Sequence, residues 1–132
     1  MAVRNYRDLI VWQLADAFKK NVFALILASP QAARDYRFRG QLQDSASAVS
    51  KDIAEGFRRF SPAVFAQFLD YALGSLQEAE ERVRDGIDLK YFPATDCDEA
   101  LRLAKRCTVA LMRLKHSQQK RPKEPRPQNR RT

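Results

Sequence analysis

The sequence predicts an all-α fold, an antiparallel up-and-down four-helix bundle. Apolar residues recur along it at steps of three and four, as they do on one face of a helix. Two Ser-Pro pairs, Ser29-Pro30 and Ser61-Pro62, each combine a capping hydroxyl with a proline suited to the first helical position. Because only residues 59–61 separate the second helical pattern from the third, these two helices must fold back on each other. Two apolar faces alone leave surface exposed, so the fold needs the two further helices that the sequence supplies.

The first helix is expected to begin at Asn5 or Asp8, either of which can cap it, and to run to Ala28. Its apolar face is wider than two-helix packing needs, and we favour a subunit contact as the reason. The face consists of Val11, Ala15, Phe18, Val22, Leu25 and Ile26, widened by Trp12, Leu14 and Phe23. The candidate residues of an oligomer interface are Trp12, Phe23 and Tyr71.

The second helix is expected to begin at Pro30. Gly40 predicts a kink or a short loop within it, because glycine costs about 1 kcal/mol in a helix interior relative to alanine. The apolar face of this helix is Leu42, Ala46, Val49, Ile53 and Phe57. Small residues over positions 45–56 predict a close approach to the third helix, where the matching small residues are Ala72, Gly74 and Ser75.

The third helix is expected from Pro62 to Asp85, ending at Gly86 or continuing through Leu89. Its apolar face is Phe65, Leu69, Ala72, Leu76, Ala79 and Val83. Acidic and basic residues that lie three and four apart over positions 78–84 predict a solvated outer face with ion pairs.

The fourth helix is expected from Asp96 to His116, because Thr95 and Asp98 approximate a capping box. Its apolar face is Cys97, Leu101, Ala104, Cys107 or Thr108, Leu111 and Leu114. From Ser117 the composition changes to polar and basic residues interrupted by three prolines, which predicts a disordered basic tail. The expected domains are therefore a helical domain over residues 1–116 and a tail over residues 117–132.

The net charge of +8 is concentrated toward the end of the chain. Residues 117–132 carry +5, which leaves +3 for the other 116 residues. Basic residues of the fourth helix fall on one outward stripe that leads into the tail. This stripe is either an ordinary solvated face or, with the tail, a surface that binds phosphate through salt-sensitive counterion release. The candidate nucleic-acid-binding residues are Arg58, Arg59, Arg102, Lys105, Arg106, Arg113, Lys120, Arg121, Lys123 and Arg126.

Residue patterns that mark an enzyme or a metal site do not occur in the sequence. The chain has one histidine, His116, two cysteines without metal-ligand spacing, and four glycines without a phosphate-binding motif. Asp52 and Glu55 are expected to pair with nearby arginines rather than to act as catalytic carboxylates. We therefore expect no enzyme activity, no cofactor, no metal and no small-molecule substrate.

The expected location is the cytoplasm. No apolar run approaches the roughly 18 residues that span a bilayer, and the N-terminal residues do not contain the apolar segment of a signal peptide. Cys97 and Cys107 lie ten residues apart on one predicted helix. Their separation along that helix is about 15 Å, which is too far for a disulfide. The two thiols are expected to stay reduced.

Three segments resemble the bacterial four helix bundle protein family: YRDLIVWQLA at positions 6–15, IAEGFRR at 53–59 and FAQFLDYALGSLQEAEE at 65–81. That family includes proteins encoded in intervening sequences of 23S ribosomal RNA genes and the accessory variability determinant of diversity-generating retroelements. The resemblance covers residues 5–116 and implies a four-helix bundle that assembles into a ring of five subunits. In the retroelement branch it also implies a basic surface that binds nucleic acid, and a reverse-transcriptase partner.

The chain departs from the family pattern just before and within its small-residue segment. Family members often carry two arginines where this chain has Gln43 and Asp44, and a Ser-Ile-Pro-x-Asn run where residues 48–52 read AVSKD. Without the basic pair, the nucleic-acid contact that the resemblance implies is weakened on that face.

Two functions are expected from these observations. The first is a non-enzymatic homo-oligomer, a pentamer by the resemblance, that serves as an RNA- or DNA-associated accessory or scaffold protein. Five such chains would together carry about +40, so weak phosphate contacts would be multiplied. The alternative is a structural or protein-interaction module without affinity for nucleic acid, in which the tail only improves solubility.

Overall fold

The structure is a computed structural model in which residues 3–122 are described. Its elements are η1 (Tyr6–Asp8), α1 (Ile10–Ala28), α2 (Pro30–Arg34), α3 (Tyr36–Phe57), α4 (Pro62–Asp88), η2 (Ala94–Cys97) and α5 (Asp98–Gln119). No strand occurs among residues 3–122, and the predicted all-α class is confirmed.

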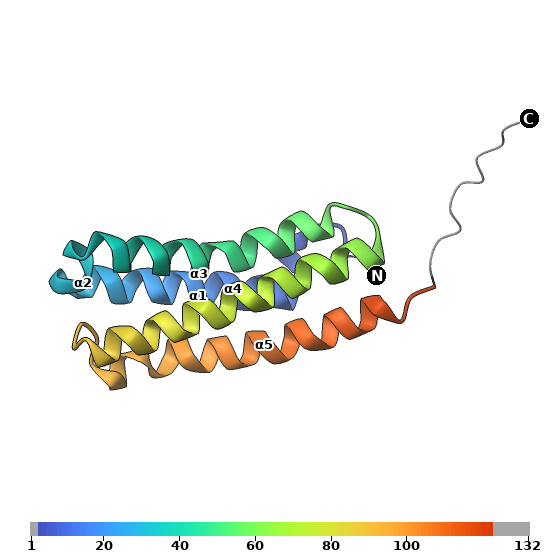
Figure 1. Cartoon of the computed structure of the whole chain (residues 1–132). Helices are drawn as coiled ribbons and strands as arrows, with labels where there is room; N and C mark the ends of the chain where they lie inside the picture. The colour runs from blue at the N-terminus through green and yellow to red at the C-terminus, as the bar shows by residue number, and fades with distance from the viewer. Residues whose placement is uncertain (1–2, 123–132) are drawn as a thin grey trace, which may run out of the picture.

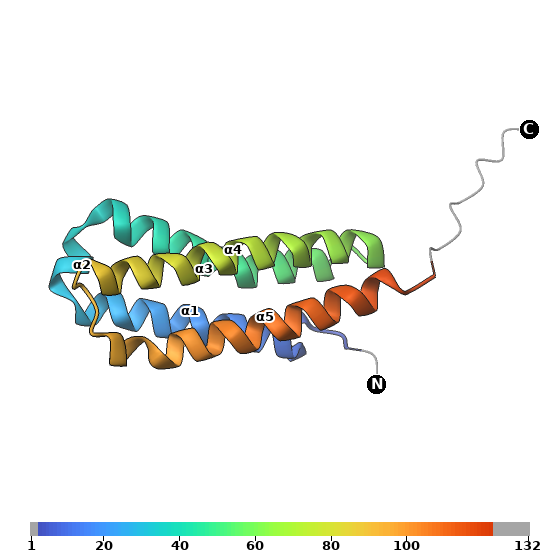
Figure 2. The ribbon, with the colours of Figure 1, turned by 60° about the horizontal axis from the view of Figure 1, so that its bottom comes forward.

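Four long helices, α1, α3, α4 and α5, lie side by side, and the chain reverses direction from each one to the next (Figure 1). Contacts join α1 to α3, α3 to α4, α4 to α5 and α5 back to α1. A second view shows the same arrangement (Figure 2). One end of the molecule holds α2 and the α4–α5 connection, and we call it the α2 end. The opposite end, which we call the η1 end, holds η1, the α3–α4 connection and the last turn of α5.

The buried core consists largely of the apolar faces that the sequence predicts. All six residues predicted for the narrower face of α1 and all six predicted for α4 are buried. On α3 the predicted residues are buried except Phe57, which is half-buried. On α5 the face is rotated slightly, because Ala100 and Leu103 are buried whereas Leu101 and Leu114 are only half-buried. Each large side chain that is fully buried contributes about 1.5–3 kcal/mol relative to an exposed position.

Both Ser-Pro signals start helices, as predicted. The hydroxyl oxygen of Ser29 accepts a hydrogen bond from the backbone N–H of Ala32 at 3.1 Å, and Pro30 is the first residue of α2. The hydroxyl oxygen of Ser61 accepts one from the backbone N–H of Val64 at 3.3 Å, at the start of α4. These bonds satisfy backbone donors that have no partner within the helix.

The break between α2 and α3 falls at Asp35, not near Gly40. The Asp35 carboxylate accepts a hydrogen bond from the backbone N–H of Phe38 at 3.1 Å and one from the hydroxyl of Tyr91 at 2.7 Å. Helix α3 runs through Gly40 without interruption, so the break expected at Gly40 is wrong. Burial of Phe38 and Leu42 on either side of it outweighs the cost of about 1 kcal/mol for one interior glycine.

Gly86 does not end α4, which continues to Asp88. A Cβ atom at position 86 would lie 2.5 Å from the ring of Phe92, so glycine here allows the two segments to pack closely. The chain turns instead at Lys90, whose φ angle is 64°. The backbone N–H groups of Tyr91 and Phe92 then donate to the carbonyl oxygen of Gly86 at 2.9 Å and 3.2 Å.

The two ends of α5 also differ from the prediction. The residue that caps its start is Cys97, which makes no side-chain capping bond, so the capping box expected from Thr95 and Asp98 is wrong. A short helix, η2, leads into α5 in its place. At the other end α5 continues to Gln119, three residues beyond the expected end at His116.

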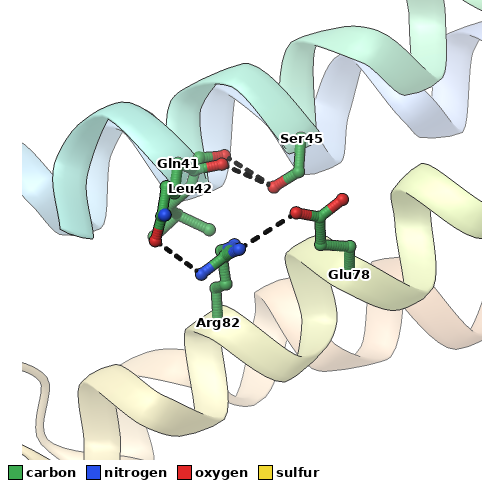
Figure 3. Close-up of polar contacts among 5 residues, drawn as sticks. All are labelled: Gln41, Leu42, Ser45, Glu78 and Arg82. Carbon is green, nitrogen blue, oxygen red and sulfur yellow. Dashed lines mark hydrogen bonds and ion pairs between the residues drawn. The ribbon is translucent and has the colours of Figure 1, made fainter. Parts of the chain in front are cut away.

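A polar contact joins α3 to α4 near the α2 end (Figure 3). The guanidinium of Arg82 donates to the side-chain oxygen of Gln41 at 2.8 Å and to Glu78 at 3.0 Å. The hydroxyl of Ser45 donates to the backbone carbonyls of Gln41 and Leu42 at 2.9 Å and 3.2 Å. Because Arg82 bonds to both helices, it fixes their relative position at a place where the seam is not purely apolar. The ion pair between Arg82 and Glu78 is one of those predicted for this helix.

Candidate nucleic-acid interface

The outward face of α5 is basic along most of its length, and α5 lies along one side of the molecule (Figure 2). From position 102 to position 123 the sequence contains no acidic residue. The side chains of the predicted stripe are all exposed: Arg102, Lys105, Arg106, Arg113, Lys120 and Arg121. Since the α-helix repeats every 3.6 residues, positions 102, 106, 113 and 120 project in nearly the same direction.

Most of these side chains are available for a ligand. Arg102 is the exception, because its guanidinium makes two hydrogen bonds to Glu99 at 2.7 Å and 2.9 Å. The hydrogen bonds from Arg102 hold the pKa of Glu99 below its ordinary value. Within residues 3–122, no ion pair involves Lys105, Arg106 or Arg113. The unneutralised part of the stripe therefore begins after Arg102.

Arg58 and Arg59 lie at the η1 end, where α3 stops. The guanidinium of Arg58 lies 5.0 Å from the centre of the Tyr6 ring. Arg59 pairs with Glu55 at 2.9 Å, as expected for this carboxylate, and lies 5.5 Å from the centre of the Phe68 ring. Both arginines remain exposed. The last turn of α5 reaches this same end, so Arg58 and Arg59 lie at the end of the molecule that also carries Lys120 and Arg121.

The ten predicted residues therefore do not form one compact site. Arg102, Lys105 and Arg106 belong to the half of α5 near the α2 end, whereas Arg113, Lys120 and Arg121 lead to the η1 end. Lys123 and Arg126 lie outside the described residues. The basic surface is long and follows one helix, as expected for contacts to several phosphates of one polymer.

Three residues at the η1 end were not predicted as part of a site. Arg7 lies 5.0 Å from the centre of the Trp12 ring and also faces Tyr6, whose ring packs edge-on against Trp12 at 5.6 Å. Lys115 pairs with Asp70 across the α4–α5 seam at 2.8 Å. Phe60 is 87% exposed. The run of aromatic and basic residues at positions 4–12 is the signal in the sequence that points to Arg7.

The candidate interface residues differ in their surroundings. Trp12 and Phe23 are half-buried and pack against the core. Tyr71 is exposed; its ring packs edge-on against Phe68, and its hydroxyl oxygen accepts a hydrogen bond from Gln67 at 2.8 Å. The wide apolar face of α1 is thus used partly within the chain, and the role of these three residues in a subunit contact stays a prediction.

The described residues contain no group of three or more histidine, cysteine or acidic side chains that could hold a metal ion. Cys97 and Cys107 are free and buried. Burial raises the pKa of the Cys107 thiol to about 12. His116 is exposed in the last turn of α5. Among residues 3–122, no helix has both the length and the apolar composition that a membrane span requires.

The described residues thus form an all-helical protein with one core and a basic outer face that follows α5, and they contain no cluster of metal-binding side chains. Comparison with sequence profiles of protein families shows the family to which this chain belongs. The profile of the 23S rRNA-intervening sequence protein family matches residues 7–113, and the chain belongs to that family. The match spans all four long helices except the last residues of α5. No curated protein matches the chain.

Proposed function

We propose that this protein is a non-enzymatic accessory or scaffold protein that associates with nucleic acid. Its architecture in this proposal is an antiparallel up-and-down four-helix bundle, assembled as a homo-oligomer and, as the family resemblance implies, a pentamer. The proposal is supported chiefly by the acid-free stretch from Arg102 to Lys123, whose basic side chains are exposed wherever the structure describes them, except for the half-buried Lys115.

The physical basis of binding is the release of counterions from phosphate by lysine and arginine. Contacts of this kind carry little sequence information, and they typically give dissociation constants of about 10⁻⁴–10⁻⁶ M at physiological salt. Several copies of the basic face in one oligomer would strengthen the binding through effective concentration. The family is named for intervening sequences of 23S ribosomal RNA, so RNA is the first probe to test.

A filter-binding titration with labelled RNA and with DNA of the same length tests the proposal. The expected result is binding that weakens steeply as salt increases. The comparison includes the full chain and a chain truncated after Pro122, which lacks the basic residues of positions 123–132. If neither form shows salt-sensitive binding with a dissociation constant below about 10⁻⁴ M, the protein is instead a structural or protein-interaction module.

Replacing Arg106 and Arg113 by glutamine should reduce binding to RNA and DNA alike. Each lost phosphate contact lowers the slope of log K against log salt by about 0.7–0.9, so the double variant should lose about 1.4–1.8. The matched control replaces Lys51 and Lys90, which are exposed on α3 and in the α4–α5 connection, and it removes the same charge. Equal losses in both variants would assign binding to net charge alone and not to the face of α5.

The other parts of the proposal have separate tests. Light scattering on the purified protein gives the number of subunits, and a monomer would contradict the homo-oligomer. A reverse-transcriptase partner, which the resemblance implies for the retroelement branch, applies if a reverse-transcriptase gene lies beside this one, and co-purification of the two proteins tests it. The location that we propose is the cytoplasm, where the buried thiols of Cys97 and Cys107 stay reduced.

A further inference from the structure

A hollow at the η1 end combines an apolar lining with basic surroundings. It has a volume of about 630 Å³ and lies where the residues before α1, the α3–α4 connection and the last turn of α5 meet. Its apolar lining includes Leu9, Phe57, Phe65 and Leu114. Ligand pockets in proteins typically measure about 300–1,000 Å³ and are mostly apolar, so this hollow has the size and lining of a ligand pocket and offers an apolar surface to the flat face of an aromatic ring.

Phe60 is an aromatic residue of the α3–α4 connection that lines the hollow. Its φ angle is 56°, in the left-handed region where bulky side chains rarely occur. The residue is 87% exposed, so it gains little from burial within the chain. A left-handed residue is common just after a helix, as at Lys90, so what singles out Phe60 is its exposed ring, which is free to stack on a ligand.

The charges around the hollow favour an anionic ligand. Arg121 lines it directly, and Arg58 and Arg59 immediately precede Phe60 in the chain. Among the described residues, none that lines the hollow is acidic. A ligand that combines a flat aromatic ring with a nearby negative charge matches this arrangement, and a nucleotide within a polynucleotide is such a ligand.

We propose that the hollow binds an unpaired base of single-stranded nucleic acid, with the base stacked on Phe60 and a neighbouring phosphate beside Arg121. A base within a duplex is stacked on both faces and cannot stack on a side chain unless it leaves the helix, whereas single strands offer their bases freely. The inference rests on the proposed function: the face of α5 binds phosphate of any nucleic acid, and the hollow selects single strands.

Fluorescence anisotropy with a labelled 12-nucleotide oligouridine and with a labelled 12-base-pair duplex tests the inference. Stacking of one base on an aromatic side chain typically changes the affinity by about 5- to 150-fold upon alanine substitution. Phe60→Ala should therefore weaken binding of oligouridine by a factor in this range. Binding of the duplex should change less than about twofold, because it uses phosphate contacts only.

Two further variants separate stacking from folding. Phe60→Gly should raise the urea midpoint of unfolding, since glycine adopts a positive φ angle without the steric cost of a Cβ atom, and it should weaken oligouridine binding as Phe60→Ala does. Tyr36→Ala removes an exposed aromatic ring at the α2 end, where Tyr36 is 72% exposed, and should leave both affinities unchanged.

The outcomes distinguish this inference from the proposed function. If the wild-type protein binds both probes and Phe60→Ala binds oligouridine equally well, the inference is wrong and the proposed function stands. If Phe60→Ala instead changes the number of subunits in light scattering, the hollow is a contact with a second copy of the chain, and the inference is also wrong. If the wild-type protein binds neither probe, both proposals are wrong.

Discussion

At Gly56 there is no room for a methyl group, whereas at Gly74 there is. A Cβ atom at position 56 would lie 2.5 Å from the Cβ atom of Phe68 and 3.0 Å from a ring carbon of Phe65. At position 74 no atom lies within 4 Å of such a Cβ atom. Both glycines lie in helices, so alanine is favoured at both positions by helix propensity alone.

Alanine should therefore have opposite effects on stability at these two positions. Gly74→Ala should raise the free energy of unfolding by about 0.5–1 kcal/mol, because only the propensity changes. Gly56→Ala should lower it, because overpacking typically costs about 1–3 kcal/mol and exceeds the gain in propensity. Urea unfolding of the two variants beside the wild-type protein measures both signs, and a stabilised Gly56→Ala would show that α4 can move away from α3.

The sequence did not distinguish these two glycines. We expected Gly74 to belong to the patch of small residues that faces α3, and this expectation is wrong, since Gly74 is exposed. Ala72 of the same patch is buried, as predicted. The close approach is made by Gly56, one of the small residues predicted for it on α3, but its partners are two aromatic residues of α4, because the rotation of each helix is not fixed by composition alone.

At the scale of the elements, the break between α2 and α3 depends on a hydrogen bond between residues far apart in the sequence. Its donor, the hydroxyl of Tyr91, comes 56 residues after Asp35. The hydrogen bonds from Tyr91 and from the backbone of Phe38 lower the pKa of Asp35. The bond to Asp35 raises the pKa of Tyr91. The hydrogen bond between Asp35 and Tyr91 thus joins the α2–α3 turn to the α4–α5 connection.

This contact should make part of the stability depend on pH. Because the pKa of Asp35 is lowered by folding, its contribution is complete above the ordinary aspartate pKa of about 3.9 and is lost as the pH falls through the folded value. The difference in unfolding free energy between the wild-type protein and Tyr91→Phe should shrink as the solution is acidified from pH 6. A difference that stays constant from pH 6 to pH 2 would mean that the charge of Asp35 is irrelevant to the contact.

Local signals in the sequence predicted the helix starts at Ser29 and Ser61 but not those of α1 and α5, whose N-cap residues, Leu9 and Cys97, make no side-chain capping bond. The Ser-Pro pairs act through neighbouring backbone groups, so Ser29 and Ser61 were read correctly. The break at Asp35 was missed because half of its cause, Tyr91, lies on another segment. The end of α4 was also uncertain, since Gly86 is required for packing against Phe92 and Lys90 takes the positive φ angle in its place.

The candidate surface was predicted only in part, because local patterns reveal the face of one helix but not a site formed by distant segments. The basic residues predicted for the outer face of α5 follow from helical periodicity and are exposed as expected, whereas Lys115, which was not among them, is half-buried. The hollow at the η1 end could not be predicted, because it is formed by three segments that are distant in the sequence. Neither the exposure nor the backbone angle of Phe60 has a signature in its neighbours, and from the sequence Phe60 is expected only to be part of a connection between two helices.

At the scale of the whole molecule, the reactivity of the two cysteines measures whether the core is closed to solvent. Both are buried, and the thiol of Cys107 donates to the backbone carbonyl of Val11 on α1 at 3.8 Å. Burial raises the pKa of both thiols, with Asp96 and Asp98 adding to the effect at Cys97. The thiolate is the reactive species. Burial therefore protects both cysteines in two ways, because reagents do not reach the sulfur and the raised pKa keeps the thiol protonated.

Neither thiol should react with a disulfide reagent such as DTNB at pH 8 while the protein is folded. Both should react rapidly in denaturant, where the thiol pKa returns to about 8.5. Cys97→Ser and Cys107→Ser, measured separately, assign any slow reaction to one residue. Fast reaction of Cys107 in the folded protein would show that α1 and α5 separate without global unfolding.

Val3 and Arg121 line the same hollow, so both termini of the described chain emerge beside the candidate surface. An affinity tag or a dye attached at Val3 or at Arg121 would therefore crowd the ligand that it is meant to detect. Leu27, which is 84% exposed at the opposite end of α1, offers a better attachment point. With both native thiols buried, Leu27→Cys would take a fluorophore or a surface linkage selectively and leave the η1 end open to solution.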